Sequence, residues 1–314
     1  MLESIAQLQA VLNGTPLANC NIALVPPAPG SDGIVFAIDV SDIDAIEAWS
    51  LLRSLTDRTG RWPLLSMMHT SRADAWERQV SEADLFSRFY FQEEQRNDRL
   101  SDSPADIIAA SAGIHVAEQL ARMPADASLE LTDALETARQ ETLRQYGTAP
   151  AIADPAAFLT RESIATCKQL EQWFLQWEIE NCADPLSIPE HGLAHIDWYF
   201  PKHESHALLL MPSLRGWEAP AYLNWYASSL CNSQFIVALL REWHEQYGAE
   251  LVAHYGTMLQ FIVSRRPANI EEAFELAWQH YTVSPCTLIL PGVSVRDHAR
   301  ALLHTDRWFL HERP

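Results

Sequence analysis

The sequence predicts an α+β protein with mixed or antiparallel sheets and an inserted acidic helical block. Short runs of β-branched and aromatic residues near both ends of the chain indicate strands, and apolar residues at helical spacing fill the middle. The 314 residues, 48% of them hydrophobic and 20% charged, are enough to bury a sizeable core. We expect an N-terminal α/β portion over residues 1–70, the acidic helical block over 71–190 and a C-terminal α+β portion over 191–314.

The N-terminal portion alternates short apolar runs with one amphipathic segment. The expected strands cover residues 21–26, 33–40 and 62–65. Pro and Gly between the first two runs predict that these strands pair. Between the last two, apolar residues recur at helical spacing over 43–55, with Ser41 or Asp42 as the expected N-cap.

The middle of the chain is acidic and lacks β-branched runs. Between Ser71 and Pro150, 15 Asp and Glu accompany 8 Arg, which gives a local net charge of 8 − 15 = −7. Leu, Ile and Phe recur at helical spacing there, with Asp, Ser, Pro or Gly between the segments. The expected helices cover residues 75–91, 107–123, 129–146 and 155–181.

Strand patterns return in the C-terminal portion. The expected strands cover residues 195–201, 206–212, 219–225, 251–255, 258–263 and 287–290. The first three are expected to form a meander, and the fourth and fifth to pair across Gly256-Thr257. The expected helices cover residues 232–246, 270–281 and 295–304.

Charge excludes two classes of partner. The chain carries 41 acidic and 22 basic side chains, a net charge of −19. A field of this sign repels phosphate backbones and anionic lipid headgroups. We therefore expect neither nucleic acid nor membrane as a partner, and a protein with a basic surface is favoured.

The ends and the cysteines indicate the compartment. The first residues, MLESIAQLQAVLNG, contain no Lys or Arg and no small-residue cleavage pattern, unlike a secretory signal. No apolar run approaches the ~20 residues that a membrane-spanning helix needs. The five cysteines are widely separated and never in C-x-x-C spacing, which argues against a disulfide framework and a thiolate zinc site. We expect a cytoplasmic protein.

The common cofactor and nucleophile motifs are absent from the sequence. It contains no G-x-x-x-x-G-K-[ST], no G-x-G-x-x-G and no G-x-S-x-G. The sequence therefore predicts no cofactor and assigns no catalytic residue.

One histidine-rich region could hold a metal if it were helical. It comprises His191, His195, Asp197, His203, Glu204 and His206. Imidazoles four residues apart share one helix face, but Gly192 and the strand-like run after it favour histidines that flank a strand. We therefore predict no metal site.

Two other groups have both a catalytic and a structural interpretation. Asp39, Asp42 and Asp44 follow a strand, where carboxylates can bind magnesium, yet acids at a helix start also favour its dipole. Cys286 could pair with a histidine as a nucleophile, although a lone cysteine near a strand is more often a small buried hydrophobe.

Several acidic and aromatic residues are candidates for contact with a partner. The acidic candidates are Glu93, Glu94, Asp98, Asp102 and Asp106. Trp217 and Trp225 flank Glu218-Ala219-Pro220, which reads as a turn, so we expect these two indoles to be exposed.

Four stretches of the C-terminal portion have a recognisable pattern. They are PAYLNW at 220–225, REWHEQYGAE at 241–250, Arg266-Pro267, and the helix from Glu272-Ala273 to Tyr281. By these stretches over about residues 210–310, and by TGRWP at 59–63, the chain resembles a bacterial family known as domain of unknown function 4253. The resemblance implies a bacterial cytosolic α+β protein and no established reaction.

The chain departs from that family at two places. Residues 226–229 read YASS where the family has a turn rich in Gly and Trp, and residues 284–287 read SPCT where it has Cys-Pro-Asp. If those positions formed a family active site, the resemblance implies a poor catalyst here.

These observations favour an acidic inhibitor or immunity-type protein that neutralises a basic toxin or another protein partner. The simpler alternative is that the negative charge only keeps the protein soluble and does not bind a partner. A metal-dependent or carboxylate-based hydrolase using Asp39 or the His191 to His206 group is a second hypothesis. A scaffold or oligomer with its tryptophans in an interface is the third.

Overall fold

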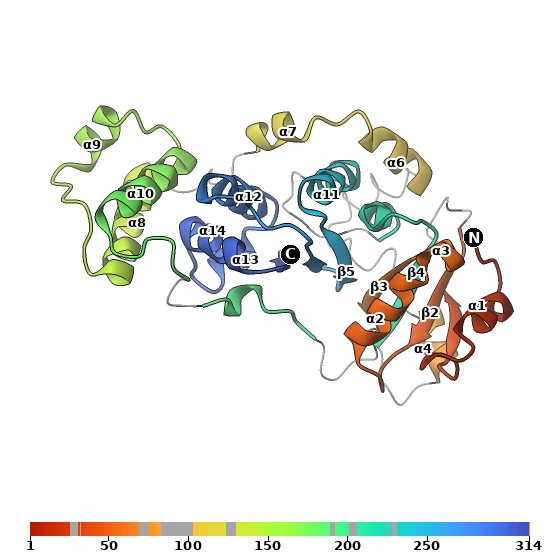
Figure 1. Ribbon diagram of the computed structural model, residues 1–314. Helices are drawn as coiled ribbons and strands as arrows, with labels where there is room; N and C mark the ends of the chain where they lie inside the picture. The colour runs from red at the N-terminus through yellow and green to blue at the C-terminus, as the bar shows by residue number, and fades with distance from the viewer. Residues whose placement is uncertain are drawn as a thin grey trace. The chain divides into compact units, whose positions relative to one another are not determined.

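The protein has an α+β fold. A computed structural model describes residues 1–25, 31, 33–68, 75–82, 103–123, 130–188, 192–200, 206–223, 225, 227 and 231–313. The chain forms two compact units (Figure 1). The first contains residues 1–116, 198–264 and 311–314, and the second contains residues 117–197 and 265–310.

The first unit is built on a mixed sheet. Its strands are β1 (Ile22–Val25), β2 (Val35–Asp39), β3 (Trp62–Met67), β4 (His206–Met211), β5 (Glu250–His254) and β6 (Met258–Ile262). They lie in the order β1-β2-β4-β3-β5-β6. Among these six strands, the β3–β5 pair is parallel and the other four pairs are antiparallel. The expected pairings of β1 with β2 and of β5 with β6 are confirmed.

Strand β4 lies at the centre of this sheet. Hydrogen bonds join it to both β2 and β3, and Ala207 to Met211 are fully buried. Such a strand needs apolar side chains on both faces, which HALLLM supplies. Strand β4 follows β3 by more than 130 residues in the chain, yet it lies between the N-terminal strands β2 and β3 in the sheet.

Helices cover the sheet of the first unit. They are α1 (Ile5–Leu12), α2 (Ala45–Ser54), α3 (Thr56–Thr59), α4 (Trp76–Glu82), α6 (Pro104–Ser111), η2 (Gly216–Ala221) and α11 (Ser233–Tyr247). Helix α2 packs on β3, where Figure 1 shows it beside the strand. The N-cap of α2 is Asp44, which accepts from the N–H groups of Ile46 and Glu47, so the expectation of Ser41 or Asp42 was wrong.

The second unit is helical. It contains most of α7 (Val116–Arg122), then α8 (Leu131–Tyr146), α9 (Pro155–Arg161), α10 (Cys167–Asn181), η1 (Ala194–Ile196), α12 (Ile270–Val283), α13 (Cys286–Ile289) and α14 (Val295–His304), and it ends in β7 (Arg307–His311). One hydrophobic cluster joins α8, α9 and α10 through Leu135, Phe158, Leu170 and Phe174. Helix α14 packs on α12 and α10.

Three expected strands are wrong. His195 and Ile196 lie in the 3-10 turn η1, and the following Tyr199 and Phe200 are exposed rather than alternately buried. Residues 219–221 belong to the 3-10 helix η2, whose consecutive small residues are buried together around Pro220. The run 287–290 is mostly helix α13, which starts after Pro285 because proline has a helical φ.

Two of the helices expected from the sequence are each divided into two shorter helices in the structure. Residues 107–123 divide into α6 and α7 around Gly113. Residues 155–181 divide into α9 and α10 at Ser163, whose φ of 58° cannot continue a right-handed helix.

Each compact unit contains residues from more than one of the three portions expected from the sequence. Helices α4 and α6 belong to the first unit, whereas α8, α9 and α10 belong to the second. The domain boundaries at 70 and 190 stay a prediction. Within the described residues, no helix is both long enough and apolar enough to cross a bilayer.

Candidate functional site

Helix α8 has an acidic hollow on its exposed face. Six side chains at spacings of three and four residues line it: Asp133, Glu136, Thr137, Gln140, Glu141 and Arg144. The other face is buried, because Leu135 and Ala138 pack into the core of the second unit. The helical period therefore separates an anionic stripe from an apolar one.

Glu136 is held in the hollow by neighbours on the same helix. Its Oε1 accepts hydrogen bonds from Arg139 Nη2 at 2.8 Å and from Gln140 Nε2 at 2.7 Å. These bonds, that of Arg139 first, favour the ionised carboxylate and lower the pKa of Glu136 to about 2. Glu136 therefore carries a negative charge at physiological pH.

Glu141 connects the hollow to a buried ionic cluster centred on Arg296 of α14. The Arg296 guanidinium donates to Glu171 at 2.6 Å, to Glu178 at 3.1 Å and to Glu141 at 3.3 Å. Burial opposes the charge, since Arg296 is 1% exposed. The three carboxylates outweigh burial and raise the pKa of Arg296.

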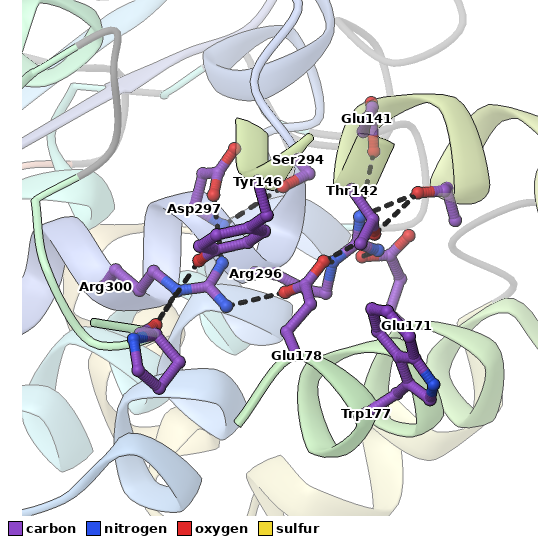
Figure 2. Close-up of polar contacts among 12 residues, drawn as sticks. Glu141, Thr142, Tyr146, Glu171, Trp177, Glu178, Ser294, Arg296, Asp297 and Arg300 are labelled. Atoms are coloured by element: carbon purple, nitrogen blue, oxygen red, sulfur yellow. Dashed lines mark hydrogen bonds and ion pairs between the residues drawn. The ribbon is translucent and has the colours of Figure 1, made fainter. Parts of the chain in front are cut away.

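Glu178 links Arg296 to Arg300, one turn further along α14 (Figure 2). Its Oε2 accepts from Arg300 Nη2 at 2.6 Å, and its Oε1 accepts from Arg296 and from Thr142 Oγ1, the latter at 2.6 Å. Both oxygens are thus engaged. Because Thr142 lies on α8 and Glu178 on α10, the cluster fixes three helices to one another.

The cluster holds more carboxylates than guanidinium groups. Two arginines accompany four acids, Glu141, Glu171, Glu178 and Asp297. Burial raises the pKa of Glu171 to about 7, and burial also raises the pKa of Glu141. With Glu171 about half protonated near pH 7, the excess of acids still leaves the cluster negative.

This arrangement supplies a fixed negative field. Buried charges survive only when paired, and here each guanidinium holds at least two carboxylates in place. The surplus charge extends to the surface through Glu141, which belongs to both the cluster and the hollow. The hollow is therefore suited to a cationic side chain rather than to an anion.

Most predicted acidic contact residues lie outside the described part of the chain. These are Glu93, Glu94, Asp98 and Asp102. Asp106 is described and forms a capping box with Ser103 at the start of α6. Its Oδ2 accepts from Ser103 Oγ at 2.7 Å, which gives this carboxylate a structural role. Contact with a partner stays a prediction for all five acids.

The expectation that Trp225 is exposed was wrong. Trp225 is 2% exposed, and its Nε1 donates to the carbonyl of Thr257 at 3.3 Å. Trp217 is half-buried and lies over His244, with 4.4 Å between the ring centroids. Glu218-Ala219-Pro220 belongs to η2 rather than to an exposed turn.

Asp39 and His206 lie close together in the first unit, where Asp39 pairs with Ala207 of β4, whereas His195 and Cys286 belong to the second unit. Asp39 ends β2, and its Oδ1 accepts from the N–H of Ser41. Cys286 starts α13. His195 is buried against His298 in the second unit, and His206 begins β4 of the first unit.

No metal site is assembled within the described residues, because no three His, Cys, Asp or Glu side chains are grouped to hold an ion. His191, His203 and Glu204 lie outside the described part.

Sequence reasoning missed the buried ionic cluster. A signal was present, since Arg296 and Arg300 are one turn apart in α14, and Glu171 and Glu178 are two turns apart in α10. Such spacings place each pair on one helix face. They do not say that the two faces meet.

Comparison with curated proteins and with solved structures gives no match. A family model does match the C-terminal part of the chain, from the start of β4 to the end of β7, and confirms the resemblance. The matched residues are 207–311, and the family is described as Domain of unknown function (DUF4253).

Proposed function

We propose that this chain is an acidic binding protein that neutralises a protein partner with a basic surface, as an immunity-type inhibitor does. The observation that carries the proposal is the acidic hollow on α8 with the carboxylate-rich cluster joined to it through Glu141. The net charge of −19 adds a long-range field of the same sign.

Electrostatics suits this function kinetically. A negative surface raises the rate of encounter with a basic partner by roughly 10- to 1000-fold at low salt. An inhibitor of a toxin benefits from fast capture, because the toxin must be bound before it acts.

The hollow can receive an arginine or lysine side chain of the partner. Asp133 and Glu136 are exposed and one turn apart, so that one guanidinium can approach both. Each exposed pair contributes about 0.2–1 kcal/mol, and several together with good shape complementarity are needed for tight binding.

The proposal is tested by association kinetics against a panel of purified basic bacterial toxins at 50 and 300 mM salt. The double variant Asp133→Asn/Glu136→Gln should reduce the association rate with an inhibited toxin by about tenfold. The matched control is Glu180→Gln/Asp306→Asn, which removes the same number of exposed charges from the second unit outside the hollow. Rates that ignore salt, or equal losses in both pairs, would contradict the proposal.

A further inference from the structure

Glu141 and Glu171 share one guanidinium group in the second unit. Arg296 Nη1 donates to Glu171 at 2.6 Å, and Arg296 Nη2 donates to Glu141 at 3.3 Å (Figure 2). The same Nη2 also donates to the carbonyl of Ala138 at 3.3 Å. Glu171 is therefore the more tightly held partner of Arg296, and Glu141, which also lines the acidic hollow, is the more weakly held one.

Water can reach both of these carboxylates. The side chain of Glu171 is 16% exposed and that of Glu141 is 23% exposed, whereas the side chains of Arg296 and Glu178 are each 2% exposed. A proton can thus pass between Glu171 and the solvent while the guanidinium stays buried. Glu171 is the point at which the buried cluster responds to pH.

The charged groups around Glu171 and Glu141 come from every helix packed against them. They are Arg144 of α8, Glu178 of α10, and Arg296, Asp297 and Arg300 of α14. Lys168, one turn before Glu171, is paired with Glu275 of α12 at 2.6 Å. Burial raises the pKa of Glu171 to about 7, against the attraction of Arg296. With the other acids ionised, the two arginines and four acids of the cluster have a net charge of 2 − 4 = −2 when Glu171 is ionised and 2 − 3 = −1 when it is protonated.

We propose that Glu171 is a pH-dependent switch that sets how strongly Glu141 attracts a cation in the acidic hollow. This inference rests on the proposed function, because it concerns the regulation of the same hollow. With Glu171 ionised, Arg296 is compensated by two carboxylates at shorter distances, and the charge of Glu141 is in excess. With Glu171 protonated, Arg296 compensates the charge of Glu141 instead.

Proton uptake by the cluster and cation binding in the hollow then oppose each other. A cation in the hollow draws Glu141 away from Arg296, which favours the ionised form of Glu171 and releases its proton. Affinity for a cation therefore rises as the pH increases from 6 to 8. The expected gain is about three- to fivefold, the effect of one unit charge at roughly 10 Å near a protein surface.

The coupling between the two glutamates can be measured in the full chain without a partner. Titration of glutamate carboxyl groups by ¹³C NMR gives the pKa of Glu171, whose signal is assigned with Glu171→Gln. Glu141→Gln removes a neighbouring negative charge and leaves more of Arg296 to Glu171, so it should lower the pKa of Glu171 by about 0.5 to 1. Glu180→Gln changes an exposed acid of the same helix and should leave that pKa unchanged. Equal pKa values of Glu171 in the wild type and in Glu141→Gln would overturn the switch.

The effect on binding is measured by calorimetry with acetyl-tetra-arginine amide, a peptide whose charges do not titrate between pH 6 and pH 8. Exposed histidines titrate equally in the wild type and in Glu171→Gln, so the switch is the difference between the two proteins. The ratio of affinities at pH 8 and pH 6 should be about three- to fivefold larger in the wild type than in Glu171→Gln, and Glu180→Gln should behave as the wild type.

Two outcomes of the calorimetry would overturn the inference: no binding of the peptide at either pH, or the same pH dependence in the wild type and in Glu171→Gln. Neither outcome decides the proposed function, which depends on how salt and the Asp133→Asn/Glu136→Gln variant affect toxin association at a single pH. The two failures are therefore distinguishable.

Discussion

Arg61 in the first unit and Arg296 in the second are both buried, with exposed fractions of 2% and 1%, yet they are surrounded by opposite chemistry. Arg61 donates only to backbone carbonyls among the described residues, those of Leu2, Ile34 and Leu210. Arg296 is held by three glutamates. Burial lowers the pKa of Arg61 to about 10, whereas the pKa of Arg296 is raised.

The difference shows two ways to bury one side chain. Carbonyl groups offer Arg61 hydrogen bonds and no countercharge, so Arg61 joins three backbone segments at the start of β3 while its charge remains unfavourable. The carboxylates around Arg296 would repel one another without it. Arg61 satisfies neutral groups, and Arg296 neutralises charged ones.

The largest expected effect is that of Arg296→Met. Removal of the guanidinium leaves three buried or half-buried carboxylates without their cation, which should cost about 3–5 kcal/mol of unfolding free energy at pH 7. Urea denaturation measures this loss. The control Arg58→Met removes an exposed arginine and should change stability by less than about 0.5 kcal/mol. A loss below 1 kcal/mol at Arg296 would contradict the role given to the cluster.

Glu171→Gln should change how the unfolding free energy of the protein depends on pH. The pKa of Glu171 is raised from 4.5 to about 7, so its ionisation disfavours the folded state as the pH rises from 4.5 to 7. The variant lacks this penalty, so from pH 4.5 to pH 8 it should gain up to about 3 kcal/mol relative to the wild type. Unfolding curves at several pH values provide the measurement, and a difference that does not vary with pH would show that Glu171 does not titrate in this range.

Arg61→Met should have a smaller effect that is independent of pH. Three carbonyl oxygens lose a donor, but an unneutralised buried charge disappears as well, so we expect a net loss of about 2 kcal/mol. The loss should be equal at pH 5 and pH 8, because no carboxylate contacts Arg61 in the described residues. A loss that differs between pH 5 and pH 8 would contradict this account of Arg61.

The smallest expected effect is that of Thr142→Val. Its hydroxyl donates to Glu178 at 2.6 Å within the cluster, and a hydrogen bond to a charged acceptor contributes about 1.5 kcal/mol. Thr137→Val, on the exposed face of the same helix, is the control and should have almost no effect on the unfolding free energy. Equal losses at the two threonines would mean that helix propensity, and not the cluster, sets the cost.

Local features of the fold were predictable from the sequence. The pairing of β1 with β2 follows from two apolar runs and a short connection, and the range 295–304 of α14 was predicted as it is observed. Ser294 supplies the N-cap of α14, by accepting from the N–H of Asp297.

Features that depend on distant segments were not predictable. Nothing within β4 says that it separates β2 from β3, because strand order is set by contacts over more than 130 residues. The same holds for Arg296, whose partners Glu141 and Glu171 come from α8 and α10. Trp225 shows a related limit, since the exposure of an indole depends on a hydrogen-bond partner such as the Thr257 carbonyl in a separate hairpin.

Helix α14 presents different chemistry on its two sides. Arg296 and Arg300 contact acids and carbonyls of α8, α10 and the segment after α10, whereas His298 contacts imidazoles of η1 and α12. Insertion of one residue before Arg296 would rotate the helix by about 100° and bring guanidinium groups toward the neutral rings. Both sets of partners would be lost together, so the length of the connection before α14 is as tightly constrained as the residues within it.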